Sequence, residues 1–191
     1  MRKPTEIIDY LLERMEGLDR RDLEARLKYL RTEGLWPRAR SVGDQKAEPV
    51  DATHCANLIM ALGGSDQAMH CVKAVKKLAA LKPRTRWQLN DESSASSAID
   101  IYQLDESDPF NLTFGFFLRT SILTRNPKKI GSLKIDCWPD IRGVMISIPD
   151  SVMLLNFGLE EQSSRLISQR LIPGEIFEMM ADFLDKDRET E

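Results

Sequence analysis

Apolar residues recur at helical spacing through the first third of the chain. Between residues 5 and 17, isoleucine and leucine fall at intervals of three and four, and Thr5 can cap a helix that ends near Gly17. A second run, "RRDLEARLKYLRTEG", repeats leucine every three or four residues after a cap at Asp19, with Gly34 as its stop. The pattern predicts two helices joined by a short turn.

The segment that follows has no hydrophobic period. "WPRARSVGDQKAEPV" is rich in turn-forming residues, which predicts a loop or a small wing. Helical spacing then returns twice, near 51–62 and 66–81, with "GGS" between the two runs. Residues 1–86 are therefore predicted to form a helical domain.

The hydrophobic pattern changes after residue 86. Short apolar runs separated by Pro, Gly, Asn and Asp predict strands: "AIDIYQL", "NLTFGFFLRTSILT", "SLKIDCW", "GVMISI" and "SVMLLNFGL". Because "FGFF" is apolar on both faces of a strand, we expect a sheet covered on both sides, by a helix or by a second subunit. A last helix, "PGEIFEMMADFLDK", begins at Pro173 and places four apolar residues on one face: Ile176, Phe177, Met180 and Leu184.

These elements predict an α+β fold in two parts. A helical, winged helix-turn-helix-like domain spans 1–86, and a mainly antiparallel sheet with a C-terminal helix spans 97–191. The second part is expected to dimerise or to bind a partner. Three cysteines give no disulfide framework, and no apolar run is long enough for a membrane span, so we expect a cytoplasmic protein with no membrane contact.

Charge divides unevenly between the two parts. Residues 1–86 carry 17 Lys/Arg and 12 Asp/Glu, whereas residues 87–191 carry 10 and 18. In the basic half, cations gather on the second predicted helix and the loop after it, and again on the fourth predicted helix, where residues 67–90 contain no acid. The candidate DNA-binding residues are Arg20, Arg21, Arg26, Lys28, Arg31, Arg38, Arg40, Lys76 and Lys77.

A second interpretation of these cations remains open. Lys and Arg commonly decorate the solvent face of a helix, and here they alternate with Glu16, Asp22, Glu24 and Glu33 at spacings that suit i, i+4 ion pairs. We favour DNA binding for two reasons: the chain has two basic clusters, and the first lies on the second helix of a helix-turn-helix arrangement. Solubility alone would not require either feature.

The stretch "LKYLRTEGLWPRAR", Leu27 to Arg40, resembles the recognition helix and the start of the wing in MerR-type winged helix-turn-helix proteins. Lys28 stands where that family has arginine, and the tyrosine, the Gly-Leu turn and the proline match: Tyr29, Gly34, Leu35 and Pro37. The resemblance covers residues 5–64. It implies a winged helix-turn-helix fold, with Arg38 and Arg40 at the wing's phosphate contacts.

The chain also departs from that family. The Arg-x-Tyr that closes the wing is replaced by "GDQKAEPV", and no long dimerising helix follows residue 65. The family's dimer and its sensing of metals or drugs are therefore not implied. We expect a homodimer on other grounds, because pairing two half-sites raises the affinity for double-stranded DNA.

Both histidines precede a cysteine, in His54-Cys55 and His70-Cys71. Adjacent residues on a helix diverge by about 100°, so neither pair can share one metal ion, and both cysteines fall on apolar stripes. We expect two core cysteines flanked by surface histidines, with no metal and no cofactor. Cys137 lacks a histidine in its half of the chain, and no phosphate-binding or nucleophile motif occurs, so we expect no enzyme; catalysis by Cys137 is the remaining alternative.

The sequence thus favours a DNA-binding protein, a transcriptional regulator with a basic helix-turn-helix. The alternative is a protein-interaction module, an inhibitor or adaptor that meets a basic partner through the acidic C-terminal half. Its charge would come from the last helix and the tail: Asp182, Asp185, Asp187, Glu189 and Glu191.

Overall fold

The computed structural model describes residues 6–38, 49–81, 113–123, 132–136, 143–147, 154–157 and 169–185. Helices and strands both occur, as the sequence predicted for an α+β fold. In chain order they are α1 (Glu6–Leu12), α2 (Arg20–Thr32), α3 (Ala52–Gly64), the short 3-10 helix η1 (Ala68–His70), α4 (Cys71–Ala79), α6 (Phe114–Leu123), β1 (Ser132–Asp136), β2 (Gly143–Ser147), β3 (Leu154–Phe157), β4 (Gln169–Pro173) and α7 (Glu175–Asp185).

Both ends of α2 form as predicted. The Asp19 carboxylate accepts a hydrogen bond from the Asp22 backbone N–H at 2.9 Å, which satisfies one of the N–H groups that the first helical turn leaves without a partner. Gly34 follows the helix with φ +70°, a left-handed conformation that glycine adopts without steric cost. By contrast, α1 ends at Leu12, earlier than the predicted stop near Gly17.

Removing the α2 cap provides a local test of stability. Asp19→Ala is expected to lower the free energy of unfolding by about 1 kcal/mol, because the Asp22 N–H loses its acceptor. Urea denaturation followed by circular dichroism measures this change. Asp19→Asn keeps an acceptor in place and is expected to retain most of the stability; equal losses in both variants would contradict the capping role.

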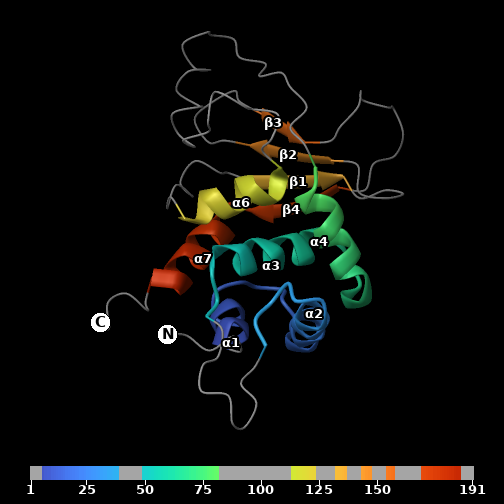
Figure 1. Ribbon diagram of the computed structural model, residues 1–191. Helices are drawn as coiled ribbons and strands as arrows, with labels where there is room; N and C mark the ends of the chain where they lie inside the picture. The colour runs from blue at the N-terminus through green and yellow to red at the C-terminus, as the bar shows by residue number, and fades with distance from the viewer. Residues whose placement is uncertain are drawn as a thin grey trace.

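The helix α3 crosses the middle of the molecule, with α1 and α2 on one side and α6 and the sheet on the other (Figure 1). Its sequence contains no charged residue, and it is buried on nearly every side. An isolated helix gains little from such a sequence, so the surrounding elements must supply its stability. The elements that pack against it come from both halves of the chain: α4, α6, α7 and β4.

One segment predicted as a strand is a helix. "NLTFGFFLRTSILT" contains α6, and the prediction of a strand there was wrong. Its buried residues follow the helical spacing i, i+3, i+4, i+7, i+8: Phe114, Phe117, Leu118, Ser121 and Ile122. The first turn is capped by Thr113 Oγ1, which accepts a hydrogen bond from the Phe116 N–H at 3.3 Å. The segment therefore helps to cover the core, and the expectation that "FGFF" is a strand apolar on both faces is withdrawn.

The predicted antiparallel sheet is confirmed. Four strands pair in the order β3-β2-β1-β4, and each neighbouring pair is antiparallel. Alternate residues face the helices, so that Ile146, Leu133 and Ile172 lie side by side across three strands and are buried. The sequence predicted β1, β2 and β3 but not β4, which lies at an edge of the sheet and ends at Pro173.

The buried apolar residues of both halves form one cluster, from Ile7 in α1 to Phe183 in α7. The predicted domain boundary, between residues 86 and 97, lies outside the described residues, and the division into 1–86 and 97–191 stays a prediction. The C-terminal helix is confirmed as α7, with the predicted face buried at Ile176, Phe177 and Met180.

Candidate functional site

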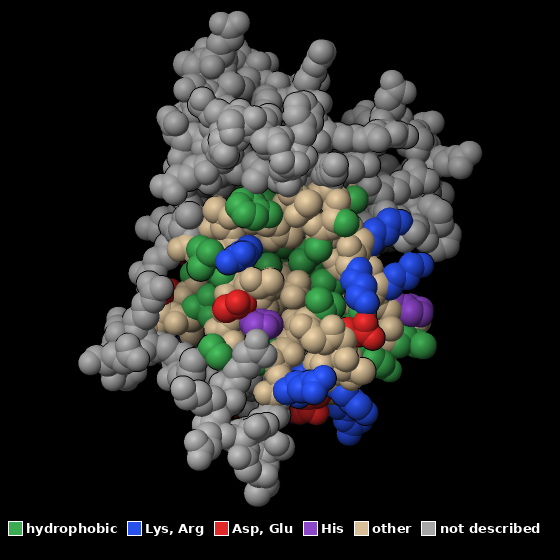
Figure 2. Space-filling model, in the orientation of Figure 1, with side chains coloured by type: hydrophobic (Ala, Val, Ile, Leu, Met, Phe, Trp, Pro, Cys, Tyr) green, Lys and Arg blue, Asp and Glu red, His purple; other side chains and the backbone are tan. Residues whose placement is uncertain are grey.

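The helices α2 and α4 pack against each other, and η1, which directly precedes α4, also packs against α2. Together these three elements contain eight Lys/Arg and only two Asp/Glu, Asp22 and Glu24. Figure 2 shows Lys and Arg side chains gathered over the right and lower parts of the described surface, with few acidic side chains among them. The two basic segments, α2 ending at Thr32 and α4 beginning at Cys71, are separated in sequence but adjoin in the fold.

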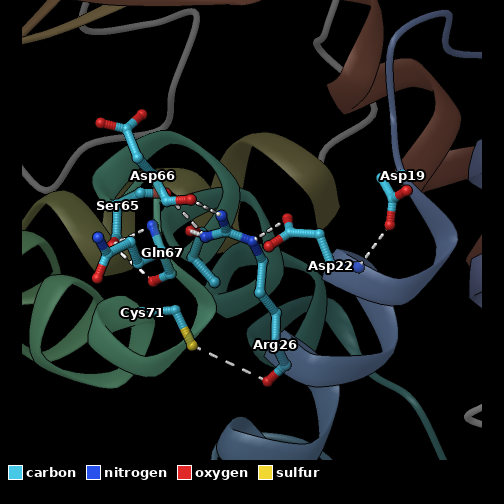
Figure 3. Close-up of polar contacts among 8 residues, drawn as sticks. Asp19, Asp22, Arg26, Ser65, Asp66, Gln67 and Cys71 are labelled. Atoms are coloured by element: carbon cyan, nitrogen blue, oxygen red, sulfur yellow. Dashed lines mark hydrogen bonds and ion pairs between the residues drawn. The ribbon is translucent and has the colours of Figure 1, made fainter.

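Arg26 does not belong to this surface. Its side chain is buried, with 3% of the residue exposed, and its guanidinium forms hydrogen bonds to other groups of the described fold. Nε donates to Asp22 Oδ2 at 2.6 Å, Nη1 donates to the carbonyl oxygens of Ala61 and Ser65 at 2.6 and 2.8 Å, and Nη2 donates to that of Asp66 at 3.2 Å (Figure 3).

The Arg26 contacts cap the carboxyl end of α3. That end carries the negative pole of the helix dipole and carbonyl groups with no partner inside the helix, so a buried guanidinium both pairs them and balances their charge. These contacts give Arg26 a structural role and count against a contact with DNA, because the guanidinium is buried and most of its N–H donors already have acceptors.

Two further candidate residues are exposed and paired with acids. Arg20 Nη2 lies 2.6 Å from Asp9 Oδ1, and this hydrogen bond raises the pKa of the guanidinium. Lys76 Nζ lies 2.7 Å from Glu33 Oε2 and so connects α4 to the end of α2. Exposed pairs of this kind contribute between zero and about 1 kcal/mol, so a phosphate group can replace the carboxylate at small cost.

The remaining candidates differ in exposure. Three of them are exposed: Arg21, Lys28 and Arg38. Arg31 and Lys77 are half-buried. Burial lowers the pKa of the Arg31 guanidinium, and its Nε and Nη2 atoms have no hydrogen-bond partner. Arg40 lies outside the described residues, as does most of the predicted wing.

Two exposed residues beside these cations were absent from the predicted site. Lys73 lies on α4 away from its buried stripe of Cys71, Val75 and Leu78. Tyr29 on α2 is 41% exposed. The helical period of residues 71–79 already places Lys73 on the solvent side, so that residue was predictable; the exposure of Tyr29 follows from packing, which the sequence does not reveal.

Both cysteines of the two His-Cys pairs lie in the core, as predicted. Cys55 and Cys71 are both fully buried, and burial raises the pKa of each thiol. His70 is exposed, whereas His54 is half-buried and its Nδ1 accepts a hydrogen bond from the Asp51 N–H at 3.2 Å, completing a capping box on α3. Within the described residues, no three His, Cys, Asp or Glu side chains gather as a metal site would require.

The last helix presents acidic side chains to solvent. Glu175, Glu178 and Asp182 are exposed and fall at i, i+3 and i+7, which places them on one face of α7. Asp185 is half-buried. The other predicted acids, Asp187, Glu189 and Glu191, lie outside the described residues.

Comparisons of the chain with protein-family models, curated proteins and solved structures found no match. The resemblance of residues 27–40 to MerR-type proteins therefore stays a prediction. Among the helices that the structure describes, none has both the length and the apolar character needed to span a membrane.

Proposed function

We propose that the protein binds double-stranded DNA through the surface of α2 and α4 and acts as a transcriptional regulator. The observation that carries the proposal is the ion pair of Lys76 with Glu33, which brings the acid-free helix α4 against the basic helix α2. Arg21, Lys28 and Lys73 are exposed on these helices and supply the positive charge that phosphate groups attract.

Binding to a random-sequence duplex, measured by fluorescence anisotropy across a salt series, tests the proposal. Each phosphate contact contributes about 0.9 to the slope of log affinity against log salt. Arg21→Glu with Lys28→Glu is expected to reduce that slope by about 2 and to weaken binding at least about tenfold at low salt. Both side chains are exposed, so the fold is expected to persist.

A matched control reverses two exposed cations elsewhere. Arg119 lies on α6 and Lys134 on the outward side of β1, and both are exposed. Arg119→Glu with Lys134→Glu changes the net charge by the same amount and is expected to leave the slope nearly unchanged. Equal losses in the two double variants would show only a response to net charge and would contradict a site on α2 and α4.

The exposed acids of α7 favour a second candidate function, binding of a basic protein partner. Glu175, Glu178 and Asp182 would meet its cations on one helical face. If the wild-type chain binds no duplex even at low salt, this function replaces the first. Replacing all three acids by glutamine or asparagine should then abolish capture of the partner while the Arg21→Glu, Lys28→Glu variant retains it.

A further inference from the structure

Two contacts fix how α2 lies along α4. At one end, Cys71 Sγ lies 3.9 Å from the Arg26 carbonyl oxygen; at the other, Lys76 meets Glu33. Residues 26 to 33 of α2 therefore run in the same direction as residues 71 to 76 of α4. The line of contact from Arg26 and Cys71 to Glu33 and Lys76 is called the α2–α4 seam below.

The register places particular side chains at this seam. On α2, Tyr29 lies four residues before Glu33, so it falls on the same side of the helix as the residue that pairs with Lys76 of α4. On the other side, Lys73 and Lys76 lie three residues apart on α4, and Met69 lies in η1, which precedes α4 and packs against α2. Tyr29 is 41% exposed and Met69 is 61% exposed, although both belong to elements that pack together.

The seam thus combines an aromatic ring with cations on both sides. Lys28 precedes the tyrosine on α2, and both Lys28 and Lys73 are exposed. Lys73 lies about one turn before Lys76 on α4, as Tyr29 lies about one turn before Glu33 on α2, so the Lys76–Glu33 pair implies that the two residues lie at a similar level. The nearest acid at the seam, Glu33, is held by Lys76 at the far end. Residues 67–81 contain no acid.

An exposed ring between lysines has the chemistry that unpaired nucleotides need. A base stacks on an aromatic face only when the base is not enclosed in a duplex, and the phosphates on either side of it bind nearby cations. Within an intact duplex the faces of the bases are covered by their neighbours, so Tyr29 could contribute there only through its hydroxyl group or its ring edge.

We propose that the α2–α4 seam binds single-stranded DNA, with Tyr29 stacked on one base and Lys28 and Lys73 on the adjoining phosphates. This inference rests on the proposed function, because both need the cations of the same basic surface; it adds single-stranded DNA to the duplex proposed there. Met69 provides an apolar contact for the neighbouring base or sugar. Such a site recognises the strand with little sequence preference, since every base offers a flat face.

The test compares one labelled oligothymidylate of about ten nucleotides with the duplex of the same length, using the full chain and anisotropy at several salt concentrations. Tyr29→Ala is expected to weaken binding of the single strand by about tenfold without changing its salt slope, because a ring is lost and no charge. Tyr29→Phe keeps the ring and is expected to bind as the wild type does. Lys73→Ala is expected to reduce the single-strand slope by about 0.7.

The outcomes separate this inference from the proposed function. The seam proposal is overturned if Tyr29→Ala binds the single strand as the wild type does. It is also overturned if the wild-type chain binds only the duplex. Either result leaves the proposal of duplex binding intact. Absence of binding to either oligonucleotide overturns both. A thermal melt of each variant, expected to match the wild type because the replaced side chains are exposed, shows that lost binding is not lost folding.

Discussion

Arg26→Ala is expected to lower the free energy of unfolding by about 3–5 kcal/mol, the cost typical of breaking a buried ionic network by removing one partner. The carbonyl oxygens of Ala61, Ser65 and Asp66 would lose a donor in a region that water does not reach freely. Equilibrium unfolding in urea measures the loss. Arg26→Lys keeps the charge but not the planar fork of donors, and is expected to fall between alanine and the wild type.

The neighbouring surface arginine provides the control for this experiment. Arg21 lies on the same helix and is exposed, so Arg21→Ala is expected to change stability by less than about 0.5 kcal/mol. A stable Arg26→Ala protein with weakened DNA binding would show instead that Arg26 contacts the ligand. Charge reversal at Arg26 is therefore unsuited to testing DNA binding, because an unfolded protein also fails to bind.

Gly63→Ala is expected to destabilise the protein by about 1–3 kcal/mol, although alanine favours a helix more than glycine does. A Cβ atom on Gly63 would lie 2.1 Å from Cδ1 of Ile172 and 2.6 Å from Cδ1 of Ile135. Both isoleucines are buried, so neither side chain can move aside into solvent. Thermal unfolding monitored by circular dichroism measures the effect.

Shortening one isoleucine should relieve the overlap. Ile172→Val removes the Cδ1 atom at the shorter distance and is expected to cost about 0.5–1.5 kcal/mol in the wild-type background. In the Gly63→Ala background the same change should cost at least about 0.5 kcal/mol less, or even stabilise the protein. Additive costs would contradict the close approach of α3 to β1 and β4.

Helices with clear caps and a regular period were predictable from sequence. Asp19 and Gly34 bracket α2, and the apolar face of α7 repeats over three turns. The α6 segment was not predicted, since phenylalanine, threonine and isoleucine favour strands and crowd its sequence. Its helical period was present at Phe114, Phe117 and Leu118, but short apolar runs fit either structure until their surroundings are known.

The sequence showed which segments of the candidate site are rich in Lys and Arg. It did not show which of these side chains face solvent. A sequence does not distinguish an arginine that caps a neighbouring helix from one that faces solvent, because the carbonyl groups that hold Arg26 lie 35 or more residues away. One local signal existed: Arg26 lies between Leu23 and Leu30 on the buried stripe of α2. Ion pairs such as that of Lys76 with Glu33 depend on packing in the same way.

The central position of α3 has a consequence for synthesis on the ribosome. α6 begins 50 residues after α3 ends, and β4 and α7 follow later still. Until those elements emerge, the side of α3 that packs against them lacks these partners. A nascent chain that stops short of them exposes an uncharged, apolar helix, the kind of surface that chaperones bind and that promotes aggregation. Packing around α3 is thus completed only when β4 and α7 have been made.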